Sequence, residues 1–515
     1  MNTLIYDSFL EWVKKEPERK AILEGNSIAK SYRELFEMGC QIASTIDLNA
    51  IDEVKTVALL GNKSFNSIAV ILGILFSGRA YSPLDINLPA IRYDKIFENF
   101  SPIGLILTGL SPQLRYELTR TKINPSFILD LVGDLPEEAF KGVPRLTLSG
   151  KKQFNGRQPL SYAYLLFTSG STGKPKGVCI SHNAANEALR MFQEHINIQE
   201  DDIIGNQVSL CFDLSMFDIF SSLSQGASIC LIPPMVTSVP NRFLNYLNEN
   251  AITSIFTVPS VVDYVLENTN SSFNNRSLRR LLLSGEPIAL NTIRKIFKAF
   301  SSNLEVWNLY GATEIPYALA EKITNEKNLN SFSLKGRNVE VRIENEVADI
   351  NGEEKSLIGE LLIKSPAMLS GYLLEGNSNL TNLKYEEWYP TGDLASINEK
   401  NVITLHGRAD RQVKIKGHRV ELDAIEHEIE NTPEVKEAAV IYHKDTKKLS
   451  AYITLITNCT EEEIKKRCQN SLSPFMRPDS FHIIKELPRT ASGKKDRQKL
   501  ISADDLQEIR KAHNG

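Results

Sequence analysis

The chain has 515 residues, which is enough for two or more folded domains. Hydrophobic residues make up 42% of it and charged residues 24%, a composition typical of a soluble globular protein. The 59 Lys and Arg against 63 Asp and Glu give a net charge of −4, so no overall positive field favours nucleic acid or an anionic membrane as a partner.

Nothing in the sequence indicates export or insertion into a membrane. The longest apolar runs, such as residues 68–76, are far too short to span a bilayer, and the first residues lack a basic start followed by an apolar core. No two cysteines form a CxxC pair among Cys40, Cys179, Cys211, Cys230, Cys459 and Cys468. We therefore expect a cytoplasmic protein with buried free thiols.

Short apolar runs alternate with helix-like stretches along most of the chain. Strands are predicted at 56–60, 165–167, 254–258, 280–283 and 305–309, and helices at 64–75, 183–193 and 261–266. This alternation predicts an α/β fold with mostly parallel sheets flanked by helices. Ligands of such sheets bind beyond the carboxyl ends of the strands. Three of these strands, at 165–167, 280–283 and 305–309, end in Gly, Ser or Thr sequences. We therefore expect these sequences to lie together in one crevice.

The pattern changes after about residue 408. Two strands at 435–442 and 449–456 flank a polar turn at 444–448, and an amphipathic helix follows at 461–472. These elements predict a small α+β domain, residues 409–515, after a large domain, residues 1–408. The polar tail from 499 to 515 is expected to fray.

The strongest chemical signal follows the strand at 165–167. The residues are Thr168, Ser169, Gly170, Ser171, Thr172, Gly173, Lys174, Pro175, Lys176 and Gly177. Glycines let the backbone approach an anion closely, while hydroxyls and lysines supply donors and charge. A flexible linker is the alternative, but a linker has no reason to follow a strand or to carry Lys-Pro-Lys. The loop is not a Walker A motif, because Pro175 stands where that motif needs Ser or Thr.

This loop resembles the phosphate loop of the adenylate-forming superfamily, which includes acyl-CoA synthetases, luciferases and the adenylation domains of peptide synthetases. The family's loop holds the β- and γ-phosphates of ATP. The resemblance therefore implies that ATP is bound by Thr168, Ser169, Gly170, Ser171, Thr172, Gly173, Lys174 and Lys176.

A second match is Tyr310-Gly311-Ala312-Thr313-Glu314. In the family this segment supplies an aromatic ring that stacks on adenine, a Thr that contacts the α-phosphate and a Glu that ligates Mg²⁺. The resemblance implies catalytic roles for Thr313 and Glu314, with Glu314 as the metal ligand. It also assigns nucleotide binding to Gly285, Glu286, Asn308, Tyr310, Gly311 and Ala312. From the residues alone, the alternative is a helix N-terminus capped by Thr313, with Glu314 in its first turn.

Two further segments match the family's ribose site and domain junction. In Tyr389-Pro390-Thr391-Gly392-Asp393, the Asp would bind both ribose hydroxyls, since a carboxylate can accept two hydrogen bonds. In the stretch from 407 to 421, the resemblance implies that Arg408 contacts the nucleotide and Asp410 is the hinge. Without the family, such a basic stretch is usually a solvated strand.

The segment from 487 to 497 matches the loop that carries the family's catalytic lysine. By resemblance this is Lys494, which would contact the substrate carboxylate and the α-phosphate. The family more often has Asn and Ile where this chain has Ser492 and Lys495, but Gly493 and Asp496-Arg497 fix the register. The alternative is an ordinary surface lysine. All the matches, which begin with the lesser match Ser31-Tyr32-Arg33-Glu34-Leu35, run in family order to residue 497.

The segment Cys211-Phe212-Asp213-Leu214-Ser215 discriminates between substrates. In amino-acid-activating members, this Asp pairs with the substrate's α-ammonium, whereas fatty-acid and aryl-acid ligases have no reason to bury a carboxylate there. The alternative is that Asp213 caps a helix through Phe217, Phe220 and Leu223. The implied lining, mostly apolar with hydroxyls, is Asp213, Leu214, Phe217, Thr257, Leu282, Ser284, Leu309, Tyr317 and Ala318. It suits a small or medium uncharged amino acid, such as serine, cysteine or d-alanine.

The resemblance therefore implies a stand-alone amino-acid adenylation enzyme that uses ATP and Mg²⁺. No phosphopantetheine attachment motif follows Arg497, so we expect transfer to a separate phosphopantetheinylated carrier protein. A d-alanine–carrier-protein ligase and an acyl- or aryl-CoA ligase are the enzymatic alternatives. A nucleotide sensor without turnover is a further one, which the intact Lys494, Glu314 and Asp393 argue against.

Overall fold

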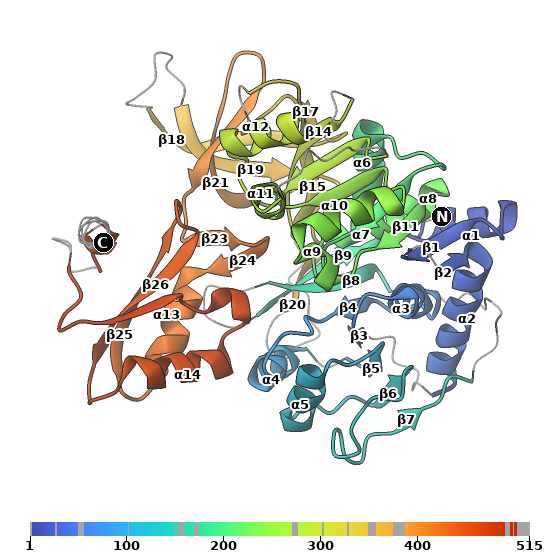
Figure 1. The fold of residues 1–515 in the computed structure, drawn as a ribbon, viewed down its shortest axis with the longest axis horizontal. Helices are drawn as coiled ribbons and strands as arrows, with labels where there is room; N and C mark the ends of the chain where they lie inside the picture. Colours follow the sequence, from blue (N-terminus) through green and yellow to red (C-terminus); the bar gives the residue numbers. More distant parts are fainter. Residues whose placement is uncertain are drawn as a thin grey trace. The chain divides into compact units, whose positions relative to one another are not determined.

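The computed structural model shows two compact units (Figure 1). The large unit comprises residues 1–86, 97–167 and 177–410, and the small unit comprises residues 87–96, 168–176 and 411–515. The described residues are 3–25, 28–49, 56–100, 102–149, 152, 154, 160–168, 175–269, 277–300, 303–326, 329–348, 357–373, 387–489, 495–497 and 499–501. Lys494, Ser169 to Lys174 and most of the polar tail lie outside them.

The first sheet has nine strands, and its central pairs are parallel. Pairs β1–β2, β14–β15 and β15–β17 at its two edges are antiparallel. In spatial order the strands are β17 (Leu334–Lys335), β15 (Ile315–Ile323), β14 (Glu305–Ala312), β13 (Arg280–Ser284), β12 (Ser254–Thr257), β10 (Ile203–Asn206), β11 (Ser228–Leu231), β1 (Lys20–Glu24) and β2 (Ile28–Ser31).

The second sheet has eight strands, and its pairs from β8 to β7 are parallel. In order they are β20 (Gly371–Leu373), β9 (Lys176–Ser181), β8 (Tyr162–Thr168), β4 (Tyr81–Pro83), β3 (Val57–Leu60), β5 (Gly104–Leu107), β6 (Phe127–Asp130) and β7 (Arg145–Leu146). The strand that leads into the phosphate loop, β8, therefore belongs to a different sheet from β13 and β14.

A third sheet of the large unit is antiparallel throughout. Its strands are β16 (Ser331–Phe332), β22 (Ile403–Arg408), β21 (Tyr389–Ile397), β19 (Leu357–Lys364) and β18 (Glu340–Ala348). The sequence did not predict this sheet. It positions Asp393 and Arg408, which are directly paired across β21 and β22.

Helices bury both faces of the first sheet. The helices α10, α11 and α12 pack on one face in a core of their own, and α3, α6 and η1 share the main core with both large sheets (Figure 1). Residues 67–76 of α3 are all buried, as expected of a helix that is apolar on every side. The helices are α1 (Asp7–Lys15), α2 (Tyr32–Asn49), α3 (Phe65–Phe76), α4 (Ala90–Asn99), α5 (Pro112–Arg120), α6 (His182–Ile196), α7 (Leu214–Met216), η1 (Phe217–Ser221), α8 (Ser222–Gln225), α9 (Pro234–Thr237), α10 (Pro240–Glu249), α11 (Pro259–Glu267) and α12 (Leu290–Ala299).

The small unit has its own hydrophobic core. Strands β25 and β26 are antiparallel, and β27 joins β26 in parallel. Helix α14 begins with a capping box between Thr460 and Glu463, which satisfies backbone N–H groups at its start. The elements are β23 (Gln412–Ile415), β24 (His418–Glu421), α13 (Leu422–Glu430), β25 (Val435–His443), β26 (Lys448–Leu455), α14 (Glu461–Ser471), η2 (Pro474–Met476) and β27 (Ser480–Ile483).

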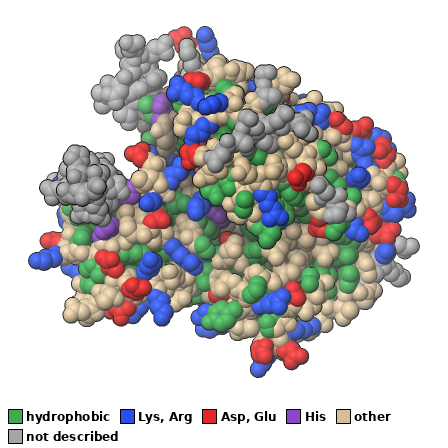
Figure 2. Space-filling view, viewed as in Figure 1, with side chains coloured by type: hydrophobic (Ala, Val, Ile, Leu, Met, Phe, Trp, Pro, Cys, Tyr) green, Lys and Arg blue, Asp and Glu red, His purple; other side chains and the backbone are tan. Residues whose placement is uncertain are grey.

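The fold class predicted from the sequence is confirmed: large parallel sheets with helices come first, and an α+β unit with antiparallel pairs follows. In the described part of the chain, no helix combines the length and apolar character that a membrane span requires. All six cysteines are free thiols, and four of them are buried. Acidic and basic side chains are interspersed on the face that Figure 2 shows.

Candidate nucleotide and substrate site

The segment Tyr310–Glu314 forms a hairpin. Strand β14 runs to Ala312, which pairs with Ile315, so only Thr313 and Glu314 form the turn to β15. The register shifts between Tyr310 and Ala312, and a Cβ at Gly311 would lie 2.5 Å from the carbonyl oxygen of Pro316. Glycine is thus needed for this close approach of backbone. The alternative of a helix capped by Thr313 is wrong.

The turn buries the carboxylate proposed as the metal ligand. Glu314 is 2% exposed, and the hydroxyl of Tyr372 donates to its Oε1 at 3.2 Å. The backbone N–H of Leu369 donates to the Glu314 carbonyl at 2.8 Å. Among the described residues no group of three or more His, Cys, Asp or Glu could hold a metal. A single carboxylate fits Mg²⁺ that arrives with phosphate oxygens and water as its other ligands.

Four candidate residues from distant parts of the sequence are linked by hydrogen bonds. The Tyr310 hydroxyl donates to Asp393 Oδ2 at 2.5 Å, and Arg408 Nη1 donates to Asp393 Oδ1 at 3.1 Å. The same guanidinium donates from Nε and Nη2 to the two oxygens of Asp410, at 2.6 and 2.5 Å. Burial, together with the charge of Asp393, raises the pKa of Tyr310 well above its usual value, so its hydroxyl stays protonated. The predicted adenine, ribose and hinge residues therefore form one chain of contacts.

Gly392 makes this arrangement possible. Its φ is +74°, and a Cβ there would lie 2.5 Å from Arg408 Nη2 and 2.7 Å from Asp410 Oδ2. Its carbonyl also accepts from the Ala409 N–H at 2.9 Å. Glycine is therefore favoured between Thr391 and Asp393 both because φ is positive there and because a side chain would clash.

The other nucleotide candidates have local protein partners or lie at strand ends. Asn308 Nδ2 donates to the Leu329 carbonyl at 2.7 Å. The Glu286 carboxylate accepts from the N–H and the hydroxyl of Ser260, both at 3.0 Å, near the start of α11. Gly285 has a positive φ of +87°. Thr168 is the last residue of β8, and Lys176 is the first residue of β9. Their part in nucleotide binding remains a prediction.

Asp213 lies at the N-terminus of the helical run from α7 to α8. Its Oδ1 accepts from the Leu214 N–H at 2.9 Å. The helix that the capping alternative required is therefore present, with Phe217, Phe220 and Leu223 buried on it. Capping and an interaction with an amine are compatible, because a carboxylate has two oxygens with several acceptor positions.

The other eight substrate candidates are almost fully buried. Their exposure lies between 0% and 8% for Leu214, Phe217, Thr257, Leu282, Ser284, Leu309, Tyr317 and Ala318. Ring centroids of Phe217 and Tyr317 lie 6.1 Å apart, and Phe192 packs on both, at 4.9 and 5.9 Å. Strand register puts Leu282, Ser284 and Leu309 on one face of the sheet. Thr257 pairs instead with Leu283 on the other face, and its hydroxyl donates to Gln207 Oε1 at 2.9 Å.

Two features near these residues were not predicted. The helical run contains a π-helical turn, η1, and its Asp218 is 1% exposed and accepts from Asn206 Nδ2 at 2.9 Å. Burial raises the pKa of Asp218 and lowers that of Lys63, the cation that partly compensates it. The hydroxyl of Tyr317 is 2.6 Å from His195 Nδ1. An Asp inside the apolar run Met216 to Phe220 was the available signal for a buried polar site.

Comparisons with known proteins identify the family. The family model described as AMP-binding enzyme matches residues 9–373, and the one described as AMP-binding enzyme C-terminal domain matches residues 424–494. The chain is 31% identical to zwittermicin A synthase ZmaJ of Bacillus cereus, over 97% of this chain and 95% of that protein. It is 30% identical to bacitracin synthase 1 of Bacillus licheniformis, over 99% of this chain but only 9% of that much longer protein.

A solved structure shares the fold over nearly the whole length. The adenylation domain AlmE of Vibrio cholerae, in complex with glycyl-adenosine-5'-phosphate, superposes with a TM-score of 0.79 at 21% identity, covering 98% of both chains. The chain belongs to the AMP-binding enzyme family and is an adenylation-domain enzyme of the adenylate-forming superfamily.

Proposed function

We propose that the protein activates a small uncharged amino acid with ATP and transfers it to the phosphopantetheine thiol of a separate carrier protein in the cytoplasm. In the first step a carboxylate oxygen of the amino acid attacks the α-phosphorus of MgATP. The bond from that phosphorus to the bridging oxygen breaks, and pyrophosphate leaves. In the second step the thiol attacks the acyl carbon, AMP leaves and the thiol proton passes to solvent.

The assignment of an amino-acid substrate depends on the placement of Asp213. It is a carboxylate at the start of a buried helical run whose neighbours in the proposed pocket are otherwise apolar or hydroxylated. An ionised carboxylate beside an uncharged lining would attract the substrate's α-ammonium and could accept a charge-assisted hydrogen bond from it. The zwittermicin and bacitracin synthases and the glycyl-adenylate complex of AlmE support the same class of substrate by analogy.

The burial of the proposed pocket lining favours a substrate amino acid with a small side chain. The rings of Phe217, Phe192 and Tyr317 pack against one another, with centroids 4.9 to 6.1 Å apart. A bulky substrate would have to displace these rings, and overpacking a close-packed interior is unfavourable. Glycine, alanine and serine are therefore favoured over aromatic or long side chains.

The nucleotide roles follow from the same placement. Tyr310 would stack on adenine, Asp393 would bind the ribose hydroxyls, and Arg408 would hold Asp393 while reaching the nucleotide. Glu314 would hold Mg²⁺ beside the α-phosphate, with Thr313 in the same turn, and Lys494 would neutralise charge that develops there. Phosphoryl-group chemistry is catalysed chiefly by such positioning and charge neutralisation. A rotation of the backbone at Asp410 would then switch the enzyme from adenylate formation to thiol transfer.

Exchange of pyrophosphate into ATP tests the proposal directly. The purified protein is assayed against glycine, both enantiomers of alanine and serine, larger amino acids, and fatty and aryl acids. A strong signal with one small amino acid is the expected result. A d-alanine signal would favour a d-alanine–carrier-protein ligase, and a signal only with acids that lack an amine would replace the proposal by a CoA ligase.

Two substitutions at Asp213 separate its possible roles. Asp213→Asn keeps an oxygen that can accept from the Leu214 N–H but removes the charge, whereas Asp213→Ala removes both. The amine interaction predicts loss of amino-acid-dependent exchange in both variants, with ATP binding retained. Full activity of Asp213→Asn would mean that the carboxylate is only a helix cap.

A further inference from the structure

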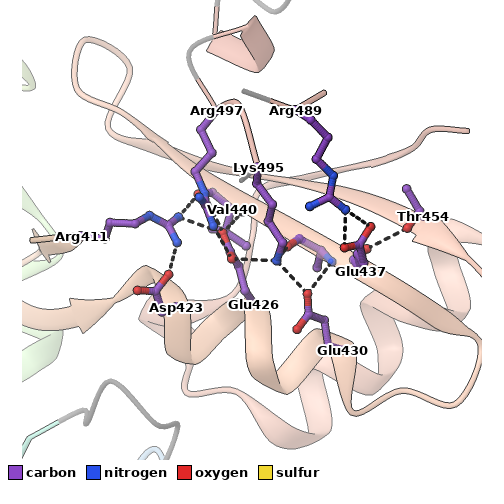
Figure 3. A network of polar contacts seen from close by, with 11 residues as sticks. Arg411, Asp423, Glu426, Glu430, Glu437, Val440, Thr454, Arg489, Lys495 and Arg497 are labelled. Atoms are coloured by element: carbon purple, nitrogen blue, oxygen red, sulfur yellow. Dashed lines mark hydrogen bonds and ion pairs between the residues drawn. The ribbon is translucent and has the colours of Figure 1, made fainter. Parts of the chain in front are cut away.

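Three basic residues of the small unit converge on one buried carboxylate (Figure 3). Glu426 of α13 is 4% exposed. Its Oε1 accepts from Arg411 Nη2 at 2.8 Å and from Arg497 Nε at 3.2 Å, and its Oε2 accepts from Arg497 Nη2 at 2.8 Å and from Lys495 Nζ at 3.3 Å. The Val440 N–H donates to Oε1 at 2.8 Å as well. We call these side chains the Glu426 cluster.

The cluster anchors residues 495 and 497, which follow Lys494 in the sequence. Lys495 forms an antiparallel bridge with Arg489, and the Asp496 N–H donates to the Pro488 carbonyl at 2.7 Å. Lys495 also donates to Glu430 Oε1 at 2.9 Å and to the Ala438 carbonyl at 2.6 Å. Lys494 directly precedes the anchored Lys495 in the sequence.

Arg489, on the other side of residues 490–494 in the sequence, is anchored separately. Arg489 Nη2 donates to both carboxylate oxygens of Glu437, at 2.5 and 2.7 Å, and Glu437 lies on β25 (Figure 3). Residues on both sides of 490–494 are thus tied by ion pairs to the helix and sheet of the small unit. A lysine that must reach an α-phosphate needs a base of this kind, because misplacement by about 1 Å can cost a hundredfold in rate.

The same carboxylate holds the first residue of the continuous C-terminal segment. Arg411 follows Asp410 in the sequence and donates to Asp423, to Glu426 and, at 2.7 Å, to the Val440 carbonyl. The Glu426 side chain therefore links the residue after the proposed hinge to Lys495 and Arg497.

We propose that Glu426 is a positioning residue for adenylate formation, which acts by fixing Lys495 and Arg497 and thereby the placement of Lys494. This rests on the role of Lys494 in the proposed function. Lys495, where the family more often has an apolar residue, adds an ionic anchor that belongs to this chain.

The charge of Glu426 is essential to this role. Burial alone would raise its pKa, but hydrogen bonds from Arg497 and the charge of Arg411 outweigh burial, and the pKa lies below its usual value. The carboxylate is therefore ionised near neutral pH, opposite three cations. Removing one partner of a buried ion pair leaves the other charges uncompensated, which a structure accommodates by moving them.

The test compares Glu426→Gln with the wild type in the two half-reactions. We expect pyrophosphate exchange to fall about 10- to 100-fold in kcat, with little change in KM for ATP. Thiolation of pantetheine by chemically prepared aminoacyl adenylate should be unchanged, because Lys494 is not used in that step. Glu434→Gln is the matched control, since it removes an ion pair with Arg467, at 2.9 Å, on the surface of the same unit.

A double-mutant cycle separates positioning from general stability. In a Lys494→Ala background, Glu426→Gln should lower exchange by no more than about twofold further, because the residue it positions is gone. The full single-mutant loss repeated in that background would overturn the proposal, as would equal loss of both half-reactions. If Glu426→Gln does not fold, Lys495→Met is used in the same cycle with the same expectations.

Failure of the proposed function is distinguishable from failure of this inference. If the wild type responds only to acids that lack an amine, the substrate assignment is wrong and the cycle is run with that acid. If the wild type responds to an amino acid but exchange by Glu426→Gln is normal, only the positioning role is wrong.

Discussion

Gly392→Ala is expected to abolish most of the activity while leaving the fold in place. The substituted Cβ would lie 2.5 Å from Arg408 Nη2 and 2.7 Å from Asp410 Oδ2. These separations are far below van der Waals contact, which begins near about 3.5 Å. The guanidinium must therefore move, and the 3.1 Å hydrogen bond that it donates to Asp393 is lost or redirected.

The size of the effect follows from two separate terms. Holding alanine at φ +74° costs about 1–2 kcal/mol of stability, whatever surrounds it. Losing a hydrogen bond between charged groups of the nucleotide site costs about 1.5–3 kcal/mol, which is about 10- to 100-fold in affinity. We therefore expect kcat/KM for ATP in pyrophosphate exchange to fall about 10- to 100-fold, with only a modest loss of stability.

Gly133→Ala is the matched control. Gly133 has a nearly identical φ of +77°, but nothing lies within 4 Å of its added Cβ. Both variants should show a similar shift in thermal unfolding, and only Gly392→Ala should lose exchange activity. Equal activity of the two variants would refute the argument that Arg408 must stay where Gly392 allows it.

Three further predictions concern other parts of the large unit. Tyr310→Phe removes the 2.5 Å hydrogen bond to Asp393 but keeps the ring, so KM for ATP should rise only about fivefold. Tyr310→Ala also removes the ring and should raise KM for ATP far more. Equal increases in KM for the two variants would contradict stacking of the ring on adenine. Phe217→Ala should lower the free energy of unfolding by about 3 kcal/mol and shift exchange toward larger amino acids; an unchanged substrate panel would contradict its place in the lining. Burial lowers the pKa of His182 to about 4. The free energy of unfolding should therefore fall as pH drops from about 6.5 to 4, by at most about 3 kcal/mol. Thermal unfolding of His182→Gln should show a weaker dependence of stability on pH over this range.

Local sequence patterns predicted much of the fold correctly. The expected strand at 56–60 corresponds to β3, the strands at 435–442 and 449–456 to β25 and β26, and the helix at 461–472 to α14. Each is a short apolar run or an amphipathic stretch bounded by polar or turn residues, so the local sequence indicates its structure. The end of β14 is different, because residues 310–312 continue as a strand only through pairing with β15. No local signal separates that hairpin from a capped helix.

The candidate site was predictable as a set of residues but not as a set of contacts. Motif resemblance singled out Tyr310, Asp393 and Arg408 independently. Their hydrogen bonds depend on the third sheet, which pairs Asp393 with Arg408, and that sheet was not predicted. The polar partners of Asp218 and Tyr317 were missed for the same reason, since contacts such as Asn206 to Asp218 depend on tertiary packing.

The contacts around residues 408–411 give the proposed hinge a physical basis. Asp410 is held by Arg408 within the large unit, whereas the next residue, Arg411, is held by Asp423 and Glu426 within the small unit. The backbone between these two side chains joins the two sets of ion pairs, and two soft dihedrals per residue are enough for a large rotation. A turn there would leave each set of ion pairs intact. The ion pairs of the Glu426 cluster would then move together with Lys495 and Arg497, which is why substitutions in the cluster should impair adenylate formation rather than the turn itself.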